Sequence, residues 1–194
     1  MIKRCSQDDF TKGSIFHIYN KTMQSLKLFY TDNDYLWFLQ RFGNVLNNYS
    51  ATIFAYCLMP NHFHFLIRQD SEKPLYSLFN HSLSPYARHL NYKLKRKGPI
   101  FQEKLQHIKI FNEKYLIQLA LYIHNNPVKA GLVCNPIEWR YSNYRNFIMK
   151  QPDKLTSPEA LEIFSEYLDE YEQMIQEYSK WVDDKKENKI FIDS

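Results

Sequence analysis

Two apolar, aromatic-rich runs separated by a short turn constrain the fold of this chain more than any other feature. Residues 51–60 read ATIFAYCLMP, and residues 62–69 read HFHFLIRQ. Both runs are rich in β-branched and aromatic residues, which strands favour, and Pro60 and Asn61 between them are typical turn residues. The two runs therefore predict a β-hairpin with strands packed in a core.

Further segments with strand or helix periodicity flank this hairpin. Strands are predicted at residues 14–22 and 105–111, and helices at residues 32–49, 73–98 and 112–127. The candidate N-cap of the first helix is Asp32 or Asn33. In the second helix, Pro85 predicts a kink or break and Gly98 predicts the end. The third helix is predicted to end at or just before Pro127. The order β-α-β-β-α-β with an added helix predicts an α+β, ferredoxin-like split βαβ fold, with helices over one face of an antiparallel sheet.

The last part of the chain differs from this body. We predict one domain over residues 1–150 and an acidic helical extension over residues 151–194. The extension carries an apolar seam with alternating spacings of three and four, formed by Leu161, Phe164, Leu168, Tyr171, Ile175, Tyr178 and Val182. Such a seam either docks on its own body or joins a second chain, so a homodimer stays open.

Charge is distributed unevenly along the chain. Residues 1–152 hold 20 Lys and Arg against 9 Asp and Glu, whereas residues 153–194 hold 5 against 12. Between residues 86 and 110, a single acid, Glu103, accompanies seven bases: Arg88, Lys93, Lys95, Arg96, Lys97, Lys104 and Lys109. This cluster predicts a polyanion such as DNA as partner. A solvated helix face would carry the same charge.

Composition excludes several classes of protein. A hydrophobic fraction of 44% argues against a disordered chain. No apolar run approaches the roughly 18 residues that a membrane span requires, and the first residues contain no apolar leader. The three cysteines are widely spaced and form no CxxC motif, so we expect neither disulfides nor a zinc-thiolate site. We therefore predict a cytoplasmic protein without a membrane partner.

His62 and His64 form the first candidate site. Successive side chains of a strand point to opposite faces, so these two imidazoles project together, roughly 6.5 to 7 Å apart along the strand. Phe63 and Phe65 then point the other way, into packing. Two imidazoles placed in this way can chelate one metal ion. They can also simply hydrogen-bond within a polar seam.

Tyr122 and Asn126 form a second candidate set. Four residues apart, they share one face of the predicted third helix. Asn126 could add a carbonyl oxygen to the two histidines as a third ligand, with Tyr122 one turn away. Two neutral imidazoles, one amide oxygen and open positions are typical of a catalytic Mg²⁺ or Mn²⁺ site. Alternatively, Tyr122 is an ordinary helix aromatic and Asn126 a residue that ends the helix before proline.

Five sequence blocks resemble, in order, those of the single-tyrosine HUH transposases, where U is a hydrophobic residue. This family includes insertion-sequence enzymes and REP-associated tyrosine transposases. Its HUH motif is resembled by MPNHFHFLI, and its nucleophile helix by YIHNNPVKAGLV. The flanking blocks are resembled by FHIYNKTMQSLKLFYTDNDYLWFL, GPIFQEK and EWRYSNY. The resemblance covers residues 14–147 and leaves the acidic extension outside.

The resemblance implies a ferredoxin-like enzyme that cuts and rejoins single-stranded DNA, usually folded into hairpins, through a 5′-phosphotyrosine intermediate. It implies His62, His64 and Asn126 as ligands of Mg²⁺ or Mn²⁺ and Tyr122 as the nucleophile. Tyr115 is disfavoured because Leu119, and not a ligand, follows it by four residues. Two other functions stay open: an inactive or domesticated hairpin-binding protein, and a metal-dependent RNA nuclease that uses water as nucleophile.

Overall fold

The computed structural model of the chain describes residues 10–24 and 26–165. This part contains a four-stranded sheet in the order β2-β3-β1-β4, in which every neighbouring pair is antiparallel. The strands are β1 (Ile15–Lys21), β2 (Ala51–Met59), β3 (His62–Gln69) and β4 (Gln106–Ile110). The sheet order and chain order confirm the ferredoxin-like split βαβ prediction.

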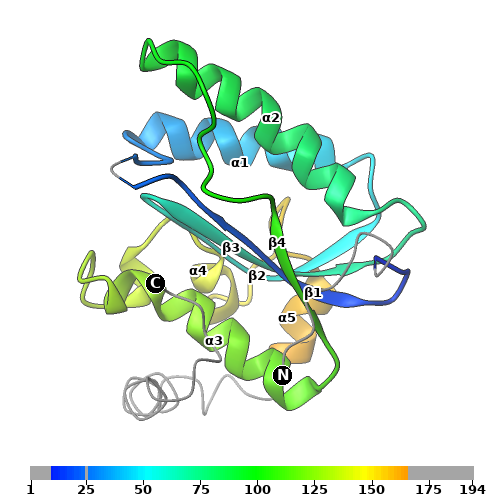
Figure 1. The fold of residues 1–194 in the computed structure, drawn as a ribbon. Coiled ribbons are helices and arrows are strands. Elements are labelled where there is room, and N and C mark those ends of the chain that lie inside the picture. Colours follow the sequence, from blue (N-terminus) through cyan, green and yellow to red (C-terminus); the bar gives the residue numbers. More distant parts are fainter. Residues whose placement is uncertain (1–9, 25, 166–194) are drawn as a thin grey trace, which may run out of the picture.

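Helices α1 (Asp32–Leu46) and α2 (Leu75–Lys93) cover one face of this sheet (Figure 1). Beneath them lies an aromatic core to which β3 contributes Phe63 and Phe65, both fully buried. Helix α1 is capped by Thr31, one residue before the candidates predicted from the sequence. The carboxylate of Asp34 accepts hydrogen bonds from the backbone N–H groups of Tyr30 and Thr31 and so satisfies donors at this end of α1.

The opposite face is also covered, which the sequence-based expectation of helices on one face did not include. Helix α3 (Glu113–Lys129) crosses it, beside the 3₁₀ turn η2 (Pro136–Glu138), α4 (Tyr144–Ile148) and α5 (Pro158–Ser165), as Figure 1 shows. The physical reason lies in β2, where eight consecutive residues are buried. A strand that is apolar on both sides must be covered on both faces.

Both internal prolines lie within their helices, so the helix end predicted at Pro127 is wrong, whereas Pro85 was predicted only to kink or break its helix. Pro85 lies inside α2, and the carbonyl of His81, to which Pro85 cannot donate, accepts a hydrogen bond of 3.3 Å from Arg41 Nη2. Pro127 lies inside α3. That helix ends instead at Lys129, with Ala130 as its C-cap, and the next residue, Gly131, has φ +67° and donates its N–H to the carbonyl of Val128. This is the glycine-capped termination that left-handed backbone permits.

Helix α2, in turn, ends before its predicted stop. It finishes at Lys93, and Lys95 already has a left-handed φ of +50°, three residues before Gly98. Within residues 10–24 and 26–165, no helix is long and apolar enough to cross a membrane.

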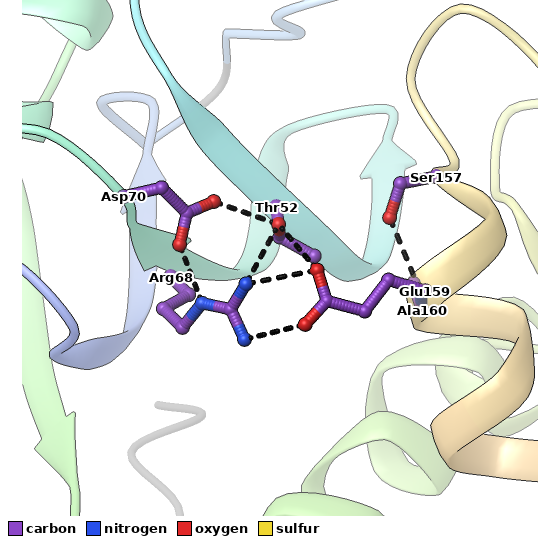
Figure 2. Close-up of polar contacts among 6 residues, drawn as sticks. All are labelled: Thr52, Arg68, Asp70, Ser157, Glu159 and Ala160. Carbon is purple, nitrogen blue, oxygen red and sulfur yellow. Dashed lines mark hydrogen bonds and ion pairs between the residues drawn. The ribbon is translucent and has the colours of Figure 1, made fainter.

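A polar cluster ties α5 to the far end of the hairpin (Figure 2). Arg68, on β3, donates from Nη1 and Nη2 to the carboxylate of Glu159, with both distances 2.9 Å. The same guanidinium contacts Thr52 and Asp70, and Ser157 caps α5 by accepting a hydrogen bond from the N–H of Ala160. Salt bridges of this kind orient elements more than they stabilise them.

The predicted apolar seam is described only at its start. Leu161 and Phe164 are buried in the core beneath α3, so this part of the seam docks on its own chain. The remaining seam residues, from Leu168 onward, lie outside the described residues. The domain limits at residues 150 and 151 stay a prediction.

Candidate functional site

His62 and His64 project from β3 toward α3, on the side of the sheet away from Phe63 and Phe65. Their ring centroids lie 5.0 Å apart. The prediction that the two imidazoles share one face is therefore confirmed. Their backbone is rigid because β3 is a central strand, paired with β2 on one side and β1 on the other.

Helix α3 places Tyr122 over this pair within the same chain. The ring centroids of Tyr122 and His64 lie 5.8 Å apart. Both side chains are buried, with 2% and 3% of their surface exposed. The structure thus brings the ring of Tyr122 beside the ring of His64, from segments about 60 residues apart in the sequence.

Asn126 follows Tyr122 by one helical turn and is tied to it. Its amide Nδ2 donates a 3.0 Å hydrogen bond to the backbone carbonyl of Tyr122. The bond engages the amide nitrogen, and the oxygen is the atom of this group that binds divalent cations. The side chain is also buried, with 5% exposed. Asn126 is therefore held beside Tyr122 in a fixed orientation.

Lys129 belongs to the same surroundings, although sequence reasoning did not single it out. Its Nζ lies 5.3 Å from the centroid of the Tyr122 ring. Lys129 follows Tyr122 by seven residues, or two helical turns, so the two share a face only if the helix runs past Pro127. The signal in the sequence was Gly131, a better candidate for the helix end than the proline.

His17 is the second residue that sequence reasoning missed. Its Nε2 lies 2.9 Å from Nδ1 of His64, and it is buried on β1. His64 pairs with Tyr19 across the β1–β3 ladder, so His17, two residues from Tyr19, is a diagonal neighbour on the same face. The alternation of residues 14–22 predicts which face of the strand His17 occupies, but no local pattern predicts the register of β1 against β3.

Burial keeps the two inner histidines neutral. It lowers the pKa of His17 to about 3. Burial also lowers the pKa of His64 well below its usual value, with smaller contributions from His62, His17 and Lys129. Neutral imidazole is the form that binds metal ions.

The residues present fit a divalent cation at this place. Nε2 of His64 is buried without a hydrogen-bond partner among the described residues. Nδ1 of His62 bonds to the amide oxygen of Asn61 at 2.7 Å, which leaves Nε2 as the basic nitrogen of the neutral ring. No group of three or more His, Cys, Asp and Glu side chains in the described chain could hold a metal. A cation here would need oxygen ligands besides the histidines.

His124 does not face the histidine pair. Its Nε2 donates to Oδ1 of Asn143 at 2.8 Å, and the same oxygen accepts the backbone N–H of Tyr56, on β2, at 2.7 Å. Burial lowers the pKa of His124 to about 4, against a smaller opposing effect of Asn143. His124 therefore anchors α3 to the sheet.

The predicted DNA-binding residues lie in different surroundings, and their role in DNA binding stays a prediction. Lys93 pairs with the buried carboxylate of Asp34 at 2.6 and 2.7 Å. Arg96 bonds to Asn91 and to the carbonyl of Pro99, at the end of α2. Lys93 and Arg96 therefore stabilise the structure locally, through these contacts within the protein.

Others of this set are placed where they can meet solvent. Lys95, Lys97 and Lys104 are exposed in the loop between α2 and β4. Lys109, on β4, lies near Phe111 and Thr11. Arg88 lines a separate groove of about 690 Å³ between α1 and α2, together with Arg41 and Lys73.

Comparisons with known proteins identify related sequences and a related fold. The sequence model of the family described as "Transposase IS200 like" matches residues 12–126. A protein of Haemophilus influenzae, whose name places it among the REP-associated tyrosine transposases, is 26% identical over 148 residues, which cover 70% of this chain and 82% of that protein. A solved REP-associated tyrosine transposase bound to a REP hairpin superposes with a TM-score of 0.62 at 19% identity, over 81% of this chain and 92% of the other.

Proposed function

Because this chain belongs to the IS200-like transposase family, we propose that it cuts and rejoins single-stranded DNA at hairpin ends, with Tyr122 as the nucleophile. The observation that carries the proposal is the 5.8 Å separation between the Tyr122 and His64 rings, in a buried site that no local sequence pattern requires. A relative of the same fold was solved with a REP hairpin bound, which supports hairpin DNA as the substrate class.

The chemistry follows from the residue types. The phenolic oxygen of Tyr122 gives up its proton and attacks a phosphorus atom, the bond from phosphorus to the 3′ oxygen breaks, and one proton is taken up by that oxygen. The products are a 5′-phosphotyrosine and a free 3′-hydroxyl. Because one ester replaces another, the 3′-hydroxyl of a second strand can reverse the step and release Tyr122, without ATP.

The phosphodiester needs its negative charge neutralised before an oxygen can attack it. A Mg²⁺ or Mn²⁺ ion, when bound, would withdraw charge from a non-bridging oxygen. His62 and His64 would hold this ion, with Asn126 as an oxygen ligand. The ammonium group of Lys129 lies beside the Tyr122 ring, where its charge would attract negative charge on the phenol or on a phosphate nearby. Water is largely excluded because Tyr122 and His64 are buried.

A Tyr122→Phe variant tests the proposal. It should form no covalent adduct when incubated with a labelled single-stranded hairpin and Mn²⁺, as read on a denaturing gel. Tyr115→Phe, on the same helix, is the matched control and should form adduct as the parent does. Cleavage by Tyr122→Phe without any adduct would favour the nuclease alternative, and hairpin binding without cleavage by the parent would favour the inactive binding protein.

The geometry also supports action within one chain. The Tyr122 and His64 of a single chain already lie together, so no second subunit is needed to complete the site. Mixing Tyr122→Phe chains with His64→Ala chains should then restore no adduct. Recovered adduct in the mixture would indicate exchange of α3 between subunits.

A further inference from the structure

The pair of imidazoles formed by His17 and His64 is a contact that the proposed chemistry does not use. His17 comes from β1 and His64 from β3, and the nitrogens that face each other are Nε2 of His17 and Nδ1 of His64, at 2.9 Å. Both side chains are buried, with 6% and 3% exposed. Two nitrogens at this distance in neutral rings share a single proton, which belongs to one ring or the other.

The position of that proton decides what His64 can bind. If Nδ1 of His64 carries it, His17 accepts, and Nε2 of His64 is left with a lone pair. If His17 carries it, the proton of His64 must sit on Nε2, where it would repel a cation. Nε2 is buried and has no hydrogen-bond partner among the described residues. A lone pair there is satisfied by a cation, whereas an N–H there stays unsatisfied.

We propose that His17 is a positioning residue that holds the proton of His64 on Nδ1 and thereby presents Nε2 of His64 to a divalent cation. This inference rests on the proposed function, because it concerns the same cation. His17 is not itself a ligand in this arrangement, since its Nε2 points at Nδ1 of His64 and not at Nε2. Partners of this kind fix the tautomer and orientation of a ligating histidine.

His62 is held in the matching way by a different residue. Its Nδ1 bonds to the amide oxygen of Asn61 at 2.7 Å. Because an amide oxygen can only accept a hydrogen bond, Nδ1 of His62 is the donor. Both histidines thus engage Nδ1 and leave Nε2 for a cation, one through the hairpin turn and the other through the neighbouring strand. The contact from His17 is the one that substitution can remove without altering the turn.

The experiment measures Mn²⁺ binding by calorimetry in the absence of DNA. His17→Phe keeps an aromatic ring but has no nitrogen, and should weaken Mn²⁺ binding about tenfold or more. His17→Gln offers an oxygen acceptor and should recover much of the loss. His107→Phe is the matched control: His107, on β4, packs against Phe10 and Phe16, and its loss should leave Mn²⁺ affinity unchanged.

A rate measurement and a spectroscopic one complete the test. His17→Phe should form adduct slowly at low Mn²⁺ and close to the parent rate at saturating Mn²⁺, because a weakened ion can be replaced by mass action. In the unaltered protein at saturating Mg²⁺, long-range ¹H–¹⁵N spectra should show His64 protonated on Nδ1, a readout that requires no variant to fold.

Two results would overturn the inference alone: parental Mn²⁺ affinity in His17→Phe, or His64 protonated on Nε2 at saturating Mg²⁺. Failure of the proposed function has a different signature. If the parent and His17→Phe differ in Mn²⁺ affinity as expected but the parent forms no adduct with DNA, the inference stands and the nucleophile proposal falls. If the parent binds no Mn²⁺ at all, both the metal site and the inference are wrong.

Discussion

The ring of His124 and the amide of Asn143 join helix α3 to strand β2. His124 Nε2 donates to Asn143 Oδ1 at 2.8 Å, and Asn143 is fully buried, with its Nδ2 directed at the carbonyl of Phe54 at 3.4 Å. His124 lies two residues from Tyr122 and on a different side of α3. The helix is therefore fixed to the sheet by one side while another carries Tyr122.

Removing this amide should loosen the helix. Asn143→Ala leaves two buried donors without an acceptor, the N–H of Tyr56 and Nε2–H of His124, and should lower the free energy of unfolding by about 2–5 kcal/mol. Urea denaturation measures the loss. Asn146→Ala, which removes one bond to the carbonyl of Gln151, should cost about 1 kcal/mol or less. Equal losses in the two variants would contradict the anchoring role of Asn143.

The cation beside Tyr122, the proposed nucleophile, gives a second prediction. Lys129→Met removes the positive charge 5.3 Å from the Tyr122 ring and should slow single-turnover adduct formation about tenfold, equivalent to ~1.4 kcal/mol. Lys129→Arg keeps the charge and should stay near the parent rate. The matched control is Lys114→Met, which removes an exposed cation at the start of the same helix. A rate unaffected by Lys129→Met would show that the cation contributes nothing to the attack.

The difference between basic residues that are exposed and those that pair within the protein gives a third prediction. Lys97 is exposed in the loop after α2, so Lys97→Met should reduce the slope of log K against log salt for hairpin binding by about 1 without changing stability. Lys93→Met should instead lower the stability and leave the salt slope unchanged, because it leaves the Asp34 carboxylate buried without its partner. Fluorescence titration at several salt concentrations, paired with urea denaturation, separates the two. A similar salt effect from both would return Lys93 to the DNA surface.

The Asp34 carboxylate makes stability depend on pH. Burial alone would raise the pKa of Asp34, but hydrogen bonds from Lys93 and from the N–H groups of Tyr30 and Thr31 outweigh it, and the net pKa lies below its usual value. The carboxylate thus contributes stability above its ordinary pKa of about 3.9, and the contribution is lost as pH falls through the lower pKa of the folded state.

Asp34→Asn should therefore be less stable than the parent by about 1–3 kcal/mol at pH 7, and the gap should narrow below pH ~4. Urea midpoints between pH 7 and 2.5 measure this. Asp32→Asn, which alters an exposed carboxylate 3.6 Å from Arg140, is the control and should show a small difference at every pH. A gap for Asp34→Asn that stays constant with pH would contradict the role of the charged pair.

The parts of the site that could be predicted from sequence are those set by local geometry. His62 and His64 share a face because strand side chains alternate, whatever the strand packs against. Tyr122 and Asn126 share a face for the corresponding reason in a helix. The sheet order followed from the hairpin and the sequence of elements, since few connections can join them.

The parts that could not be predicted depend on contacts between distant segments. His17 meets His64 through the register of β1 against β3, which no turn between them fixes. Lys129 joins the site because α3 continues past Pro127, which general helix-ending rules disfavour. Lys93 was assigned to DNA because its partner, Asp34, lies 59 residues away and no pattern in the sequence connects them.

The alternation along β3 also makes the enzyme sensitive to length in a way that substitution would not reveal. Deleting or inserting one residue within β3 would exchange the two faces of that strand. The imidazoles would then point into the apolar core beneath α1 and α2, and the phenylalanines toward α3. The β2–β3 pairing already contains one irregularity, between Ile53 and Ala55, so a change of length would be tolerated only where a further bulge restores the alternation. The length of this hairpin is therefore strongly constrained.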